Sequence, residues 1–212
     1  MSLHREQILA RACELFIAGG LEGLSMRKLA GGVGVTAPAL YRHYESKEAV
    51  VLDVIGEAYN TFSQYLYRGL QGETPEERFS LTGRNYLAFA LEHPQFYEVL
   101  HISPSQLGLE TLPKVAASHA CTAGQFLVDR VREGMECGML RPGDAEGVAR
   151  TIWAHAHGLI SIYHRGLLRM EEEAFTSFFL ESSWRLMGGI GNEEFVREMD
   201  EEAAAAVASH DR

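Results

Sequence analysis

The sequence predicts an all-α protein, with a three-helix helix-turn-helix domain at its N-terminus and a larger helical bundle after it. Apolar residues recur at the 3.6-residue spacing of amphipathic helices along most of the chain. Two short helical segments joined by a glycine-containing turn lie within residues 24–48. Glycine pairs and a proline interrupt the helical pattern, at Gly19-Gly20, His93-Pro94 and Gly188-Gly189.

The first helix is expected from about Arg5 to Ala18, where Gly19-Gly20 ends it. Its apolar residues form one stripe along the helix, which consists of Ile8, Leu9, Ala12, Leu15 and Phe16. This helix is expected to brace the helix-turn-helix, because two short helices are too small to hold a core alone.

Two cap signals define the helix-turn-helix. Ser25 precedes a short helix that we expect to end at Gly34, a residue suited to the left-handed conformation of a tight helix exit. Thr36 precedes a second helix of about two turns, residues 37–43, with Pro38 in its first turn. The residues expected to turn inward are Leu29, Val35, Leu40 and Tyr44. In such a pair the second helix enters the major groove of DNA.

A long linking helix is expected over about residues 47–69, with Ser46 as its cap. Its apolar positions recur at helical spacing and are Val50, Val51, Val54, Ile55, Ala58, Phe62, Tyr65 and Leu66. Lys47 lies at the positive end of this helix, which is unfavourable for the fold alone. Since a helix N-terminus also attracts phosphate, Lys47 is a candidate phosphate ligand.

The C-terminal part reads as further helices separated by clear breaks. Residues 74–77, Thr-Pro-Glu-Glu, form a capping box that starts a helix, and His93-Pro94 ends it. A short apolar segment, residues 96–102, is followed by a predicted loop to Pro113 and by helices over about 114–137, 144–165 and 172–187. The helix over 144–165 is apolar on more than one face, so we expect it to touch its own core and a second subunit.

These elements predict a domain of residues 1–48, a bundle of residues 49–191 and an acidic, alanine-rich tail of residues 192–212. We assign no function to the tail.

The charge is unevenly distributed along the 212 residues. The net charge is −10, but residues 1–48 hold six Lys/Arg and five Asp/Glu, whereas the rest hold 13 and 24. Folding can therefore gather the basic residues of the helix-turn-helix on one surface, as DNA binding requires. The acidic remainder either discourages non-specific DNA binding or serves solubility.

The start of the chain lacks the apolar segment of a signal peptide, and no apolar run is long enough to span a membrane. We therefore expect a cytoplasmic protein. Three scattered cysteines, Cys13, Cys121 and Cys137, fit a reduced compartment, and Cys13 reads as a packed thiol.

The helix-turn-helix resembles the DNA-binding domain of the tetracycline-repressor (TetR) family. The matching positions are Ser25, Arg27, Leu29, Ala30, Gly34, Val35, Leu40, Tyr41, His43, Tyr44, Lys47 and Glu48. The resemblance implies a homodimeric transcriptional regulator whose C-terminal domain binds a small effector and whose last two long helices form the dimer interface. Residues 153–158, with Trp153, His157 and Gly158, resemble a Trp-His-Gly element in one branch of this family.

The candidate DNA-binding residues lie on the faces of the helix-turn-helix that do not turn inward. They are Ser25, Arg27, Thr36, Ala37, Pro38, Tyr41, Arg42, His43 and Lys47. Ala37 and Pro38 either contact a thymine methyl or serve only to start the helix. Arg27 reads a guanine edge or touches phosphate, whereas Thr36, Tyr41, His43 and Lys47 are expected to contact phosphates and set the register.

The candidate effector-binding residues are aromatic side chains and histidines of the C-terminal domain. They are Phe89, His93, Phe96, Phe126, Trp153 and His157, and core packing is the competing interpretation of each aromatic. The expected mechanism is a homodimer on an inverted-repeat operator of double-stranded DNA, with two recognition helices about 34 Å apart or a multiple of that. A small, apolar effector then favours a subunit spacing that releases DNA. The sequence leaves open the alternative that the effector promotes DNA binding.

No enzyme, cofactor or metal site is expected. Glu98 and His101 form one Glu-x-x-His pair, but a di-iron bundle needs two such pairs and further glutamates. His155 and His157 are two residues apart and point to different helix faces. The alternative function is a helical-bundle protein that binds a ligand or a partner protein without binding an operator.

Overall fold

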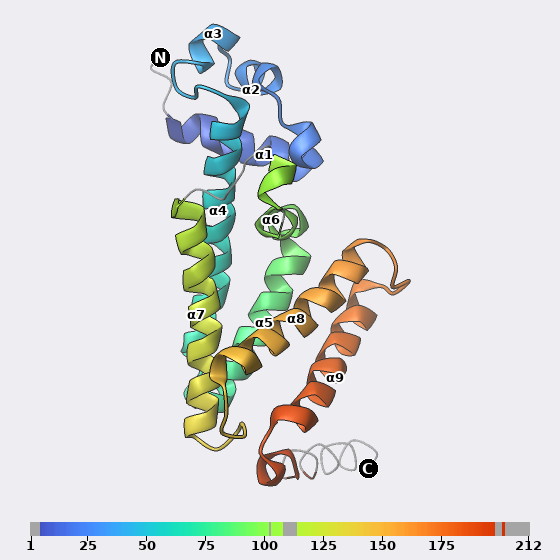
Figure 1. Cartoon of the computed structure of the whole chain (residues 1–212). Helices are drawn as coiled ribbons and strands as arrows, with labels where there is room; N and C mark the ends of the chain where they lie inside the picture. Colours follow the sequence, from blue (N-terminus) through green and yellow to red (C-terminus); the bar gives the residue numbers. More distant parts are fainter. Residues whose placement is uncertain (1–4, 102, 108–113, 198–200, 202–212) are drawn as a thin grey trace. The chain divides into compact units, whose positions relative to one another are not determined.

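The computed structural model describes residues 5–101, 103–107, 114–197 and 201. The described residues form helices joined by turns (Figure 1). Among them, Leu140 and Gly191 form an isolated antiparallel bridge. Two compact units are present, one of Met1–Gln64 with Phe89–Thr122 and one of Tyr65–Ala88 with Ala123–Arg212. The predicted all-α class is therefore confirmed. The predicted division after residue 48 stays a prediction, since compactness groups the first part of the linking helix with the N-terminal helices.

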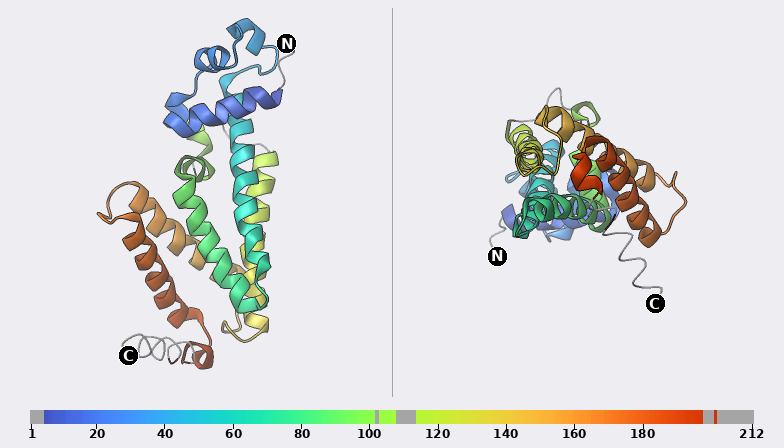
Figure 2. Two further views of the ribbon diagram at one scale, coloured as in Figure 1. Left: turned by 180° about the vertical axis from the view of Figure 1, so that it is seen from behind. Right: turned by 90° about the horizontal axis from the view of Figure 1, so that it is seen from below.

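In the first unit, helix α1 (Arg5–Gly23) packs its stripe inward, with Ile8, Ala12 and Phe16 buried. The break predicted at Gly19-Gly20 is present as a kink, because both glycines have non-helical backbone angles. A further helical turn follows the kink and reaches Gly23. Helix α1 contacts α6 (Pro94–Leu100) (Figure 2). The rings of Phe16 and Phe96 stack at 6.3 Å.

Helices α2 (Met26–Gly32) and α3 (Ala37–Leu40) form the helix-turn-helix. The predicted cap at Ser25 is confirmed, since its hydroxyl accepts from the Lys28 amide at 3.2 Å. Gly34 has a φ of 73°, as the predicted helix exit requires. Thr36 holds the predicted N-cap position of α3, but its side chain makes no capping hydrogen bond. The second helix is also shorter than expected, and residues 41–43 form a turn.

Helix α4 (Lys47–Arg68) follows the predicted linking helix closely, and the short 3₁₀ helix Gly69–Gln71 extends it. The cap at Ser46 is confirmed by a 3.2 Å bond from the Ala49 amide. In the first unit the stripe of α4 is buried at Val50, Val51, Val54, Ile55, Ala58, Tyr59 and Phe62.

Helix α5 (Pro75–Glu92) starts at the predicted capping box and ends before Pro94 as expected. The Glu77 amide donates to the Thr74 hydroxyl at 3.2 Å, and the Glu77 carboxylate accepts from the Glu73 amide at 2.7 Å. A 3₁₀ helix, Pro104–Leu107, follows α6. Of the loop predicted up to Pro113, residues 108–113 lie outside the described part of the chain.

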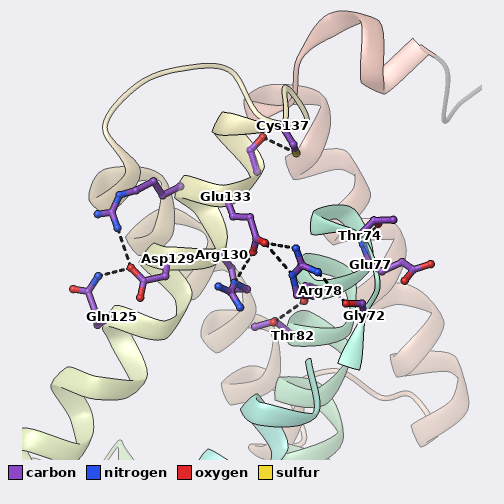
Figure 3. A network of polar contacts seen from close by, with 12 residues as sticks. Gly72, Thr74, Glu77, Arg78, Thr82, Gln125, Asp129, Arg130, Glu133 and Cys137 are labelled. Atoms are coloured by element: carbon purple, nitrogen blue, oxygen red, sulfur yellow. Dashed lines mark hydrogen bonds and ion pairs between the residues drawn. The ribbon is translucent and has the colours of Figure 1, made fainter. Parts of the chain in front are cut away.

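In the second unit, the N-terminal part of α5 contacts helix α7 (Lys114–Glu136) through a polar network (Figure 3). The Arg78 guanidinium forms an ion pair with Glu133 and also donates to the carbonyls of Gly72 and Glu73. Arg130 pairs with Glu133 at 3.1 Å from the other side. The adjacent Arg78 guanidinium therefore holds the pKa of Glu133 below its usual value, with a further contribution from Arg130.

A small apolar core closes the end of α7 in this unit. Val131, Met139, Leu140 and Ala149 are its buried members. A Cβ atom at Gly134 would lie 2.6 Å from Met139 Cε, so a larger residue there would require the Met139 side chain to shift.

Helices α8 (Ala145–His164) and α9 (Glu172–Ile190) lie against each other in the second unit (Figure 2). The cap at Asp144 is confirmed by a 3.1 Å bond from the Glu146 amide. The predicted end of the last helix at Gly188-Gly189 is wrong, because α9 continues to Ile190. Its end is instead fixed by pairing, with the Arg141 amide donating to the Ile190 carbonyl at 3.1 Å. Of the tail, residues 193–197 are helical and the alanine run lies outside the described part.

Candidate nucleic-acid interface

The helix-turn-helix separates its residues into a buried face and an open face. Leu29, Leu40 and Tyr44 are buried as predicted, with exposed fractions of 0%, 0% and 1%, whereas Val35 is half-buried. Of the candidate DNA-binding residues, Arg27, Thr36, Pro38, Tyr41 and Arg42 are exposed. The remaining candidates, Ser25, Ala37, His43 and Lys47, are half-buried. The open face therefore presents two arginines and an aromatic side chain, which are common in contacts with DNA phosphates and bases.

Two lysines are partly used by the fold itself. The Lys47 ammonium donates to the Leu21 carbonyl at 2.9 Å, and the Lys28 ammonium donates to the Gly23 carbonyl at 3.3 Å. Both carbonyls belong to the C-terminal end of α1, where a cation is favoured. An ammonium has three donors, so Lys47 keeps two for other acceptors. The contact with Leu21 also supplies a structural reason for Lys47 at this position, which the sequence did not reveal.

Three side chains that no pattern in the sequence connects meet at the Asp53 carboxylate on α4. The Tyr44 hydroxyl donates to Asp53 Oδ2 at 2.7 Å, and Arg5 donates to the same oxygen from Nε at 3.1 Å and from Nη2 at 2.9 Å. The Arg5 guanidinium also lies 4.6 Å from the centroid of the Tyr44 ring. Burial, together with the bond to Asp53, raises the pKa of Tyr44 to about 12, so its hydroxyl stays protonated and donates. The signal for this group was an acidic residue inside the apolar pattern of α4 and a tyrosine at an inward position, whose hydroxyl needs a partner.

Three of the candidate effector residues lie together in the first unit. The ring centroids of Phe89 and His93 are 5.8 Å apart, and those of His93 and Phe96 are 6.1 Å apart. Phe89 is fully buried and its ring also lies 4.9 Å from Phe62. Phe96 is 4% exposed. These contacts favour core packing for Phe89 and Phe96, the competing interpretation of the aromatic residues.

The other three candidates belong to the second unit. Phe126 packs its ring edge against Tyr67 at 5.8 Å and lies below the Arg130 guanidinium. Trp153 and His157 stack on α8 at 5.4 Å, nearly parallel, and Trp153 is 45% exposed. Burial lowers the pKa of His157, and nearby Arg165 lowers it further. Trp153 therefore gives α8 an exposed aromatic side chain, with the half-buried His157 ring stacked on it.

Among the described residues, no three His, Cys, Asp or Glu side chains are grouped to hold a metal ion. His101 Nδ1 instead lies 2.8 Å from the Tyr97 carbonyl.

None of the helices in the described part of the chain is long and apolar enough to cross a membrane.

Cys13 is expected to be the slowest of the three cysteines to react with iodoacetamide at pH 8. Burial raises the pKa of its thiol to about 11, and nearby Glu57, Asp53 and Glu14 add to the effect. Only about one Cys13 in a thousand is then a thiolate at pH 8, whereas Cys121 is exposed. Mass spectrometry of timed samples measures the order, and labelling in denaturant gives the control. Equal rates for Cys13 and Cys121 in the native protein would contradict a packed thiol.

Two family models match the chain. The model described as bacterial regulatory proteins, tetR family, matches residues 8–54, and the model described as tetracyclin repressor-like, C-terminal domain, matches residues 79–181. Among known proteins, the tetracycline repressor protein class C of Escherichia coli is 44% identical over 61 residues, which are 29% of this chain and 27% of that repressor. The HTH-type transcriptional repressor KstR2 of Mycolicibacterium smegmatis is 28% identical over 142 residues, 65% of this chain and 68% of that repressor.

Solved structures share the fold over most of the chain. A protein of unknown function from Rhodococcus sp. RHA1 has a TM-score of 0.77 at 22% identity, covering 91% of this chain and 97% of that one. The ketosteroid transcriptional regulator KstR2 of Mycobacterium tuberculosis has a TM-score of 0.67 at 20% identity, with the same two coverages of 91% and 97%. The helix-turn-helix has the buried and open faces of a DNA-binding segment, and two family models match the two parts of the chain. The chain therefore belongs to the TetR family of bacterial regulatory proteins.

Proposed function

We propose that this TetR-family DNA-binding regulator is a homodimeric repressor that acts in the cytoplasm and catalyses no reaction. Each subunit presents one recognition helix, so the operator is an inverted repeat with half-sites about 34 Å apart or a multiple of that. The observation that carries the proposal is the division of the helix-turn-helix, where Leu40 and Tyr44 are buried while Tyr41 and Arg42 are exposed. A fold-only role for this segment would not require basic and aromatic side chains on its open face.

The DNA contacts follow from the open face and its charges. Arg27 and Arg42 are exposed guanidinium groups, which bind phosphates or the edges of guanines. Tyr41 and Thr36 supply hydroxyl groups to phosphates, and Ala37 and Pro38 supply apolar contact to thymine methyl groups. The Ser25 hydroxyl already caps α2, so its contribution is to hold the N-terminus of that helix.

The effector is a small apolar molecule that binds in the C-terminal domain and lowers operator affinity. A hundredfold release needs only about 2.7 kcal/mol of coupling between the two sites. Helix α4 is the proposed relay, because it starts directly after the helix-turn-helix and runs through 22 residues. Ketosteroids and other polycyclic apolar molecules are the first effectors to test, since the related KstR2 is named a ketosteroid transcriptional regulator.

The test is the selection of binding sites from a random pool of duplex DNA by the purified protein. Enrichment of an inverted repeat, bound as one dimer per site, is the expected result. The enriched duplex then serves as the probe for effectors that release it. The absence of any enriched sequence, with and without cell extract as a source of a co-ligand, would contradict the proposal and favour the alternative of a helical-bundle ligand-binding or interaction protein.

Replacing Lys47 by alanine is expected to weaken binding to all duplexes by the same factor. If the two free donors of the ammonium bind a phosphate, the slope of log affinity against log salt falls by about one for each phosphate that the variant no longer binds. The measurement is a salt titration by fluorescence anisotropy with operator and unrelated DNA. Lys114→Ala, which removes an exposed lysine at the start of α7, is the matched control. A lower melting temperature with an unchanged salt slope would leave Lys47 only its bond to the Leu21 carbonyl.

A further inference from the structure

The Asp53 carboxylate on α4 links Tyr44, which follows the recognition helix α3, to Arg5 in the first turn of α1. One oxygen, Oδ2, accepts hydrogen bonds from the Tyr44 hydroxyl and from two nitrogens of Arg5, all between 2.7 and 3.1 Å. Tyr44 is 1% exposed, while the side chains of Asp53 and Arg5 are 31% and 60% exposed. The three residues come from α4, from the segment after α3 and from the first turn of α1, all within the first unit.

The recognition helix α3 contacts α2 and buries Leu40, but few other contacts fix its direction. Helix α3 spans only four residues, and its own backbone bonds are few. Its continuation is tied to it, since the Tyr44 amide donates to the Leu40 carbonyl at 3.1 Å. The Tyr44 ring therefore moves with the recognition helix. The hydroxyl at the far end of that ring donates a hydrogen bond to Asp53.

We propose that Tyr44, Asp53 and Arg5 form a positioning lock that sets the direction in which α3 is presented to the major groove and thereby contributes to the discrimination of operator from non-specific DNA. This inference rests on the proposed function. None of the three needs to touch DNA for this role. The lock acts on residues such as Tyr41 and Arg42, which follow α3 directly and precede Tyr44.

Specific and non-specific binding respond differently to such a lock. Non-specific binding is the summed attraction between basic groups and phosphates, and it tolerates small changes of orientation. Base contacts depend on hydrogen-bond geometry and lose their free energy when a donor is displaced by about 1 Å. A loosened recognition helix therefore loses operator affinity while its affinity for unrelated DNA and its salt slope stay the same.

The charge arrangement makes Asp53 the central member. Its carboxylate accepts a charge-assisted bond from Arg5, and such bonds are stronger than those between neutral groups. Arg5 also covers the face of the Tyr44 ring, so the cation holds both the ring and the carboxylate. The exposure of Asp53 allows water to replace the tyrosine hydroxyl, which keeps the fold intact when that hydroxyl is removed.

The test compares Tyr44→Phe with Tyr59→Phe. Both variants remove a single hydroxyl from a buried tyrosine of the first unit, and Tyr59 on α4 lies outside the lock. Tyr44→Phe is expected to lower operator affinity about ten-fold while leaving affinity for unrelated duplex DNA unchanged. Tyr59→Phe is expected to change neither affinity. Equal losses on both DNAs would assign Tyr44 a purely structural role and overturn the inference.

A second readout needs no DNA. Hydrogen exchange of the Tyr41, His43 and Tyr44 amides, which bond back to α3, should quicken in Tyr44→Phe while the amides of the second unit keep their rates. Asp53→Asn, which keeps the size of the side chain and removes its charge, should give the same local change. Unchanged exchange in both variants overturns the lock. If the exchange quickens but the wild-type protein selects no operator, the three residues still position α3, whereas the proposed function fails and the role in operator discrimination fails with it.

Discussion

Truncation of Phe89 to alanine is expected to lower the free energy of unfolding by about 3–5 kcal/mol. Phe89 is fully buried, and its ring lies 4.9 Å from Phe62, 5.8 Å from His93 and 6.4 Å from Tyr97. Removing the ring takes away these contacts and leaves a cavity that the neighbouring rings only partly fill. Urea denaturation followed by circular dichroism measures the change, and the melting temperature should fall by about 6–20 °C.

The Phe89 prediction also separates the two interpretations of this residue. Phe126→Ala removes the same atoms from a half-buried ring and should cost less than about 2 kcal/mol, which makes it the matched control. If Phe89→Ala costs under about 1 kcal/mol and abolishes the response to an effector, Phe89 lines a ligand cavity. A large stability loss instead places it in the core, as its ring contacts indicate.

The helices were largely predictable because their signals are local. The kink at Gly19-Gly20, the left-handed Gly34 and the break before Pro94 each depend on the backbone of the residue itself. The caps at Ser25 and Asp144 likewise depend on a side chain reaching an amide within three residues.

The end of the last helix could not be predicted in this way. Two glycines cost an α-helix only about 1 kcal/mol each relative to alanine, so they permit an end without requiring one. The stop comes from residues 139–141, where the Asn192 amide donates to the Met139 carbonyl at 2.9 Å and Leu140 bridges to Gly191. Such pairing between distant segments leaves no periodic pattern in the sequence.

The sequence predicted which residues of the candidate DNA-binding surface are buried. It did not predict the side-chain contacts that hold this surface in place. The spacing of Leu40 and Tyr44 correctly indicated the buried face. The sequence contains no information on the distances between Arg5, Tyr44 and Asp53, which lie up to 48 residues apart. Lys47 shows the same limit, since its helix position suggested an anion while the acceptor of its ammonium is the Leu21 carbonyl.

Replacing Trp153 by alanine is expected to weaken the proposed homodimer about 30- to 1000-fold, as the loss of a central tryptophan does in protein interfaces. Helix α8 was predicted to be apolar on more than one face, yet in a single chain Trp153 is 45% exposed and stacks on His157. Gly158 on the same helix is exposed and carries no side chain, which permits close approach of a second helix. Sedimentation velocity over a range of concentrations measures the change in dimer affinity.

The loss of the dimer should carry over to DNA, because a monomer holds only one half-site of an inverted repeat. Trp153→Ala should therefore bind a full operator little better than a single half-site, whereas the wild-type protein should prefer the full operator strongly. Leu70→Ala, which removes an exposed apolar side chain outside α8 and α9, is the control and should leave both the dimer and this preference unchanged. If Trp153→Ala stays dimeric but no longer responds to an effector, Trp153 belongs to the effector site, and the subunits must associate through a different surface.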